Sequence, residues 1–210
     1  MPHKPPTSAV RRRAERAKAP DGRQLLQLAN RAAWRRWLAK NHATSDSVWL
    51  VLRKQSAAGT GLRYEAAVEE ALCFGWIDST ANKHDADCVR QLFSRRKPSS
   101  MWSRSNKERV GRLIAAGKMQ PAGRAMIDAA RANGMWTVLD SVESLEVPTD
   151  LAAALRAVRG ARKYFDAFSP YVRKETLRWI ASAKKPETRA RRIAETARRA
   201  ALGERAIDRK

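Results

Sequence analysis

Residues 64–80 read YEAAVEEALCFGWIDST and predict a helix, a stop and a strand in direct succession. Apolar side chains recur at three- and four-residue spacing in the first part, at Tyr64, Ala67, Val68, Ala71 and Leu72. That spacing predicts a helix over 64–74. Gly75 is placed to end this helix, because glycine readily adopts the left-handed conformation that follows many helices. Residues 76–80 then predict a short strand.

The segments on either side extend this pattern into a small sheet. Residues 47–54 (SVWLVLRK) are rich in β-branched and aromatic side chains and predict a strand, and residues 88–94 (CVRQLFS) predict another. Polar turn-forming residues at 81–87 connect the strands at 76–80 and 88–94, so these two are expected to form a β-hairpin. Residues 25–40 carry an apolar stripe at helical spacing and predict a helix.

Beyond residue 95 the chain predicts helices alone, so strands are confined to about residues 47–95. Pro98 breaks the last strand, and Ser103 is a candidate N-cap for the next helix. The periodicity predicts helices at 104–116, 121–132, 151–158, 163–168, 171–184 and 187–202. Short strands followed by helices indicate an α+β domain and then an all-helical region.

Composition divides the chain into four parts. Residues 1–22 contain four prolines and a net charge of +4, and they predict a disordered basic tail. Residues 23–137 hold the α+β domain. Residues 138–150 predict a linker, and residues 151–210 hold the helical region.

Charge is the outlying property of this 210-residue chain. Lys and Arg number 43 against 21 Asp and Glu, which gives a net charge of +22. Polyanions such as nucleic acid are therefore plausible partners, although an Arg-rich proteome would give the same number. No apolar run approaches the roughly 18 residues of a membrane span, so no transmembrane segment is expected. Two cysteines, Cys73 and Cys88, are too few for a disulfide framework and fit a cytoplasmic location.

Three separated blocks of this sequence resemble a known family. They are ALCFGWIDS at 71–79; Arg95-Arg96-Lys97 leading to Trp102-Ser103, Asn106, Leu113 and Gly117-Lys-Met119; and Ala183-Lys184, Glu187-Thr-Arg189 and Arg192-Ile193. In this order and spacing they resemble the YdeI/OmpD-associated family, also called the OmdA or bacteriocin-protection family, over about residues 34–202.

The resemblance implies a small, soluble bacterial protein with a role in tolerance of bacteriocins or antimicrobial peptides. It implies a front part similar to the YjbR/CyaY-like folds, with a small antiparallel sheet and helices, and a helical OmdA segment at about 147–202. No catalytic residues come with the family. The chain departs from the pattern at Ser94, where many relatives carry proline before the arginine pair, so this strand end is expected to be less rigid.

The strongest candidate site is the basic, aromatic stretch at 90–112. Adjacent guanidinium groups, a tryptophan face and the start of a helix favour a phosphate or carboxylate ligand. The carboxylate of the preceding WIDS segment can orient that ligand or pair with an arginine. The predicted ligand-binding residues are Asp78, Ser79, Arg95, Arg96, Trp102, Ser103 and Asn106. The alternative interpretation puts Trp102 in the core, Ser103 in a capping role only, and the charges in solvent.

Other chemistries find little support in the sequence. It contains three histidines and no motif of a serine hydrolase, a P-loop or a dinucleotide-binding fold. The cysteines lack the spacing of metal ligands, so no metal site and no cofactor are expected. Cys73 has apolar neighbours and is expected to be buried and unreactive.

Three functions stay open at this point. The first is a non-enzymatic protein of the YdeI/OmpD-associated type, which binds an anionic ligand or protein partner and contributes to bacteriocin or envelope-stress tolerance. The second is a nucleic-acid-binding protein that acts through its basic tail and helices. The third is an enzyme on a small anionic substrate, which would use Asp78 with the arginine pair.

Overall fold

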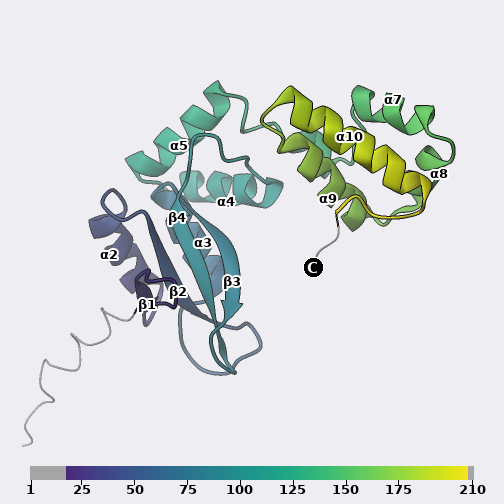
Figure 1. The fold of residues 1–210 in the computed structure, drawn as a ribbon. Helices are drawn as coiled ribbons and strands as arrows, with labels where there is room; N and C mark the ends of the chain where they lie inside the picture. Colours follow the sequence, from purple (N-terminus) through teal and green to yellow (C-terminus); the bar gives the residue numbers. More distant parts are fainter. Residues whose placement is uncertain (1–17, 208–210) are drawn as a thin grey trace, which may run out of the picture. The chain divides into compact units, whose positions relative to one another are not determined.

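A computed structural model describes residues 18–207 of the chain. Its contacts divide these residues into two compact units, one of residues 18–100 with 106–129 and one of residues 101–105 with 130–207. The first unit contains a sheet with helices, and the second contains helices (Figure 1). The predicted α+β fold with an all-helical C-terminal region is therefore confirmed.

The sheet of the first unit has four strands in the order β1-β2-β4-β3. The strands are β1 (Leu25–Gln27), β2 (Ser47–Arg53), β3 (Trp76–Lys83) and β4 (Cys88–Arg95). β4 pairs antiparallel with both β2 and β3, which confirms the predicted hairpin. β1 pairs parallel with β2, so the sheet is mixed and the expectation of an antiparallel sheet was wrong.

The single helix predicted over 25–40 is a strand followed by a helix. Leu26 is buried and pairs with Leu50 of β2, so this end of the segment adds a strand outside the predicted range of 47–95. The helix α2 (Arg31–Asn41) begins after Asn30, whose side-chain oxygen accepts a hydrogen bond from the Ala33 N–H at 3.0 Å. This N-cap satisfies a backbone donor that the helix start leaves open, and it separates the two elements.

The core of the first unit lies between the sheet and the helices α2 and α3 (Tyr64–Cys73). The Trp34 ring lies 5.5 Å from the Phe93 ring of β4, and its indole N–H donates to the Ala67 carbonyl at 3.0 Å. Glu70 of α3 is buried and pairs with Arg31 and Arg35 of α2. Apolar packing and charge pairing therefore hold α2 and α3 together.

The helices α4 (Arg104–Ala115) and α5 (Pro121–Ala132) follow the sheet, as predicted. α5 packs against the end of α3, where the Gln120 N–H donates to the Cys73 carbonyl at 3.1 Å. Gly123 permits this approach, because a Cβ there would lie 2.3 Å from the Cys73 carbonyl oxygen. A glycine in α5 thus sets the distance between the two helices.

The second unit is built from short helices around one long helix. They are α6 (Asp140–Glu143), α7 (Thr149–Ala157), α8 (Ala161–Ala167), α9 (Pro170–Ala181) and α10 (Pro186–Ala201). α10 packs against α7, α8 and α9 (Figure 1). Leu151, Leu155 and Phe165 are fully buried in the core between them. None of the helices within residues 18–207 is long and apolar enough to cross a membrane.

Three predicted boundaries differ from the structure. Residues 101–105 and 130–137 of the predicted α+β domain belong to the second unit. Leu139 and Val142 are buried in the core of the second unit, so the segment predicted as a linker at 138–150 is part of that unit. Residues 18–22 of the predicted tail pack on the first unit, because Ala19 is buried and Asp21 accepts a hydrogen bond from the Trp49 indole N–H at 2.9 Å. The rest of the tail, residues 1–17, lies outside the described residues.

Candidate anion-binding site

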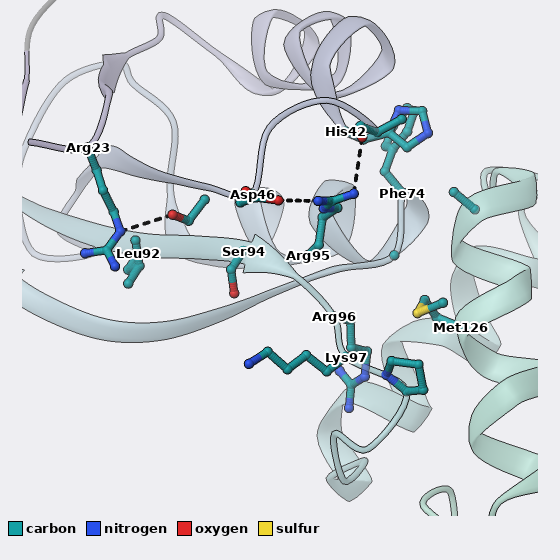
Figure 2. A pocket seen from close by; sticks show the side chains of 15 residues that line it. Arg23, His42, Asp46, Phe74, Leu92, Ser94, Arg95, Arg96, Lys97 and Met126 are labelled. Atoms are coloured by element: carbon teal, nitrogen blue, oxygen red, sulfur yellow. Dashed lines mark hydrogen bonds and ion pairs between the residues drawn. The ribbon is translucent and has the colours of Figure 1, made fainter.

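A cleft of the first unit lies at one end of its sheet (Figure 2). Its volume is about 770 Å³. Four segments converge there: the loop at 42–47 before β2, the turn at 74–75 before β3, the end of β4 with residues 96–98, and the α5 residues Ala122 and Met126. Every one of these segments belongs to the first unit, so the cleft is a feature of that unit alone.

Gly75 is the point where these segments are tied together. Its φ of +73° is a conformation that favours glycine, and a Cβ there would lie 2.9 Å from the Ala122 carbonyl oxygen. Its own carbonyl accepts a hydrogen bond from the Arg96 N–H at 2.9 Å. The predicted helix stop is therefore also the residue that brings α5 and the end of β4 to the cleft.

Four cationic side chains line the cleft: Arg23, Arg95, Arg96 and Lys97. Of the described residues that line it, Asp46 alone carries a carboxylate, and it forms an ion pair with Arg95. Arg95 also donates to the Ala43 carbonyl at 3.2 Å. Arg23 donates to the Ser47 hydroxyl at 3.1 Å, on the other side of the cleft in Figure 2. Positive charge therefore exceeds negative charge at this site.

Arg23 and Arg95 form ion pairs with Asp21 and Asp46, whereas Arg96 faces the charge of Asp78 and Lys97 is exposed. Arg96 is only 5% exposed, and its burial lowers its pKa to about 10, a shift that the charge of Asp78 opposes. Lys97 is exposed and pairs with no carboxylate among residues 18–207. An anion in the cleft would stabilise the charged form of both side chains.

Neighbouring arginines at a strand end are expected to point to opposite faces, so that only one reaches a ligand. Figure 2 shows the Arg95 and Arg96 side chains leaving the chain in opposite directions. Both nevertheless line the cleft, and Arg95 is the last residue of β4. The structure therefore brings the predicted arginine pair together at one site.

Asp78 and Ser79 do not line this cleft. Asp78 accepts a hydrogen bond from the Tyr64 hydroxyl at 2.9 Å. Burial and then the charge of Asp78 raise the pKa of Tyr64 to about 12. Ser79 is exposed on β3, and its carbonyl accepts a hydrogen bond from the Gln91 side chain at 3.1 Å. Asp78 thus acts on the cleft through the charge that it presents to Arg96.

The three remaining predicted residues have local structural partners. Trp102 belongs to the second unit, is 1% exposed, and lies 5.0 Å from the Trp136 ring. Ser103 directly precedes α4, and its hydroxyl lies 3.2 Å from that of Ser105. Asn106 accepts a hydrogen bond from Arg109 at 2.9 Å. None of the three lines the cleft, and Trp102 is the core residue of the alternative interpretation.

Several cleft residues were missed by the sequence reasoning. Arg23 lies at the edge of the predicted tail, and Asp46 precedes the best predicted strand. Met126 comes from α5, some thirty residues after the arginine pair. The loops at the strand ends could have pointed to these residues, because loops that meet at one edge of a sheet commonly form binding sites.

Among residues 18–207, the cysteines and the glutamates of α3 form no second site. Cys73 is buried, as predicted, Cys88 is partly exposed, and both are free thiols. Burial raises the pKa of the Cys73 thiol above its ordinary value. Within residues 18–207 there is no group of three or more His, Cys, Asp or Glu side chains able to hold a metal ion. Glu65, Glu69 and Glu70 pair with arginines of α2 and α4, which is a structural role.

Comparison with known families assigns the two parts of the chain separately. Residues 26–126 match a family model described as a domain of unknown function (DUF8412), which covers most of the cleft. Residues 144–203 match the family model OmdA, described as bacteriocin-protection, YdeI or OmpD-associated. No curated protein and no solved structure gave a match, so the likeness to YjbR/CyaY folds stays a prediction. The OmdA match at residues 144–203 is therefore consistent with the resemblance of this chain to the YdeI/OmpD-associated family.

Proposed function

We propose that this chain is a non-enzymatic, cytoplasmic protein that binds a small anion in the cleft of its first unit and contributes to tolerance of bacteriocins or envelope stress. The observation that carries the binding function is a cleft with four cationic side chains and one carboxylate. The family description of residues 144–203 supports the role in tolerance. The free cysteines support a reducing compartment.

The side chains of the cleft favour binding over catalysis. Arginine and lysine offer several donors to a phosphate or carboxylate, and these charge-assisted bonds are strong. The enzymatic alternative relied on Asp78 together with the arginine pair, but Asp78 does not line the cleft and is held by Tyr64. The Nδ1 of His42 lies 3.0 Å from the Leu38 carbonyl, so this imidazole is engaged by the end of α2. Binding is thus the function with the most support.

Calorimetric titration of the full chain with inorganic phosphate tests this proposal. Lys97→Ala should weaken binding about tenfold or more, because a hydrogen bond to a charged group contributes about 1.5–3 kcal/mol. Lys83→Ala is the matched control, since it removes the same charge from an exposed position of β3 outside the cleft. Equal affinity of both variants and the native protein would overturn the cleft as the anion site.

The nucleic-acid alternative predicts a different outcome in a parallel titration. A single-stranded DNA oligomer would bind through charges on both units, so Lys97→Ala and Lys83→Ala would weaken it equally. The slope of log K against log salt would then be about −0.7 for each phosphate neutralised. A shallow slope together with a selective effect of Lys97→Ala supports the small-anion site instead.

The role in tolerance has its own test. A bacterial strain that lacks the gene is complemented with the native gene or with either lysine variant. Its survival is then measured after challenge with a bacteriocin. Complementation by Lys83→Ala but not by Lys97→Ala would connect the cleft with tolerance. Restoration by both variants to the native level would separate tolerance from anion binding.

A further inference from the structure

The cleft is larger than a bare anion requires. Its volume is about 770 Å³, which lies in the range of about 300–1,000 Å³ typical of small-molecule sites. A phosphate ion has five non-hydrogen atoms and displaces on the order of 100 Å³ or less, judged from the ~30 Å³ share of a water molecule. The cleft therefore has room for a further part of the ligand beside the anion.

Beyond the cations, the lining combines polar residues with apolar side chains that could contact a ligand. Met126 and Leu92 are both partly exposed there, and Figure 2 shows Met126 projecting from α5 toward the strand end that carries Arg96. The Phe74 ring is almost fully buried, with Arg35 5.4 Å from the centre of the ring and the His42 ring 5.3 Å away. Phe74 is thus a fixed part of the wall, whereas Met126 offers surface to a ligand.

The apolar wall is held in place independently of any ligand. The Met126 Cγ packs so close to Gly75 that a Cβ on that glycine would lie 3.0 Å from it. Gly75 in turn accepts the hydrogen bond from the Arg96 N–H. Gly75 therefore lies against the Met126 side chain and also holds the backbone of Arg96, so an apolar group and a cation lie near the same residue. The flexible thioether of methionine adapts to ligands of different shape.

We infer that the ligand is an amphiphilic anion, with a phosphate or carboxylate head held by Arg96 and Lys97 and a short alkyl or aromatic body on Met126. This inference rests on the proposed function, because it assumes that the cleft binds anions. Charge selects the head group, and burial of the body against the apolar wall adds affinity that a bare anion lacks. Two sources share this chemistry, a free organic acid or phosphate ester and an acidic lipid.

The test is a calorimetric series on the full chain with inorganic phosphate, butyl phosphate, hexyl phosphate and neutral hexanol. Affinity should rise roughly fourfold for each buried methylene, so hexyl phosphate should bind at least about tenfold tighter than inorganic phosphate. Hexanol should show no measurable binding. Competition with vesicles that contain phosphatidic acid separates the two sources. Displacement of hexyl phosphate by the vesicles would indicate that the ligand is a lipid, and absence of displacement would indicate a soluble anion.

The variants separate this inference from the proposed function. Met126→Gln keeps the Cγ that packs on Gly75. It should remove most of the increase in affinity from inorganic phosphate to hexyl phosphate, while the affinity for inorganic phosphate stays unchanged. Met135→Gln alters a partly exposed methionine of the second unit and should have no effect. Equal binding of hexyl and inorganic phosphate would overturn the inference but keep the anion site, and no binding of either would overturn both.

Discussion

Asp46 forms an ion pair with Arg95 in the lining of the cleft, and the backbone joins the same two residues through a hydrogen bond from the Arg95 N–H to the Asp46 carbonyl at 3.1 Å. The Asp46 carboxylate therefore already pairs with one of the four cationic side chains that line the cleft. Both side chains are exposed, Asp46 to 85%, so the ion pair contributes little to folding. An entering anion has to compete with Asp46 for Arg95.

Asp46→Asn should raise the affinity for inorganic phosphate up to about fivefold. An exposed ion pair contributes about 0.2–1 kcal/mol, and this is the amount of competition that the substitution removes. Calorimetry measures the change, and the melting temperature should stay nearly constant. Asp87→Asn is the control, because Asp87 is exposed, pairs with Arg53 and lies outside the cleft. A lower affinity for Asp46→Asn would show that Asp46 orients Arg95 for the ligand.

Local signals made most of the fold predictable. The end of α3 at Gly75, the β3–β4 hairpin and the N-cap of α9 at Ser169 depend on residues close in sequence, and each was readable there. β1 could not be predicted, because its three residues gain their strand conformation from parallel pairing with residues 49–51, more than twenty positions away. Tertiary contact there overrode a helical pattern of apolar residues.

The candidate site was predictable only where its residues are neighbours in sequence. The arginine pair is adjacent, so its common location follows from the sequence alone. Met126 reaches the cleft because Gly75 and Gly123 let α5 approach the end of α3, a packing relation that no single segment carries. Trp102 was expected at the site because it follows the arginines closely, but its packing partner is Trp136 of the second unit.

Gly123→Ala should destabilise the first unit by about 1–3 kcal/mol or more, the usual range for forcing extra volume into a packed region. The added Cβ would lie 2.3 Å from the Cys73 carbonyl oxygen and 2.7 Å from that of Leu72, so α5 would have to move. Gly111→Ala is the matched control within α4, where a Cβ meets nothing within 4 Å. It should stabilise by about 0.5–1 kcal/mol, because alanine favours a helix interior. Thermal unfolding of the two variants measures the difference, and similar stabilities would contradict the close packing of α5 on α3.

Cys73 should react with a thiol reagent only after the structure opens. It is fully buried, and its burial raises the pKa of the thiol, so the reactive thiolate is scarce at neutral pH. A Cys88→Ser variant leaves Cys73 as the single thiol for a labelling time course with a maleimide. Labelling should be slow in buffer and complete within minutes in urea. Rapid labelling in buffer would show that the end of α3 is exposed in solution.

Acid should weaken α10 as the pH falls from about 4.5 toward 2. Hydrogen bonds from Arg198 and Arg199, at 2.9 and 2.7 Å, lower the pKa of Glu195 to about 2 in the folded protein. Because the folded value is below the ordinary one, the stabilisation is fully present above pH 4.5 and is lost as the pH falls through 2. Carboxyl NMR should place the Glu195 midpoint near 2. The variant Glu195→Gln should lose less stability than the native protein over this pH range, and an identical pH dependence would contradict the assignment.

Arg96→Met should abolish most anion binding without weakening the fold. Arg96 is 5% exposed, and its burial lowers its pKa to about 10, which means that the folded protein disfavours the charge it holds. Methionine keeps the unbranched apolar stem and removes a charge that burial disfavours. Asp78 stays satisfied in the variant, because it is partly exposed and accepts the hydrogen bond from Tyr64. We therefore expect the melting temperature to be unchanged or higher, and the affinity for inorganic phosphate to fall about tenfold or more. Arg36→Met, in the exposed part of α2 and outside this cleft, is the control for loss of one arginine. A large loss of stability with unchanged binding would assign Arg96 to the fold and leave the anion site to Arg95, Lys97 and Arg23.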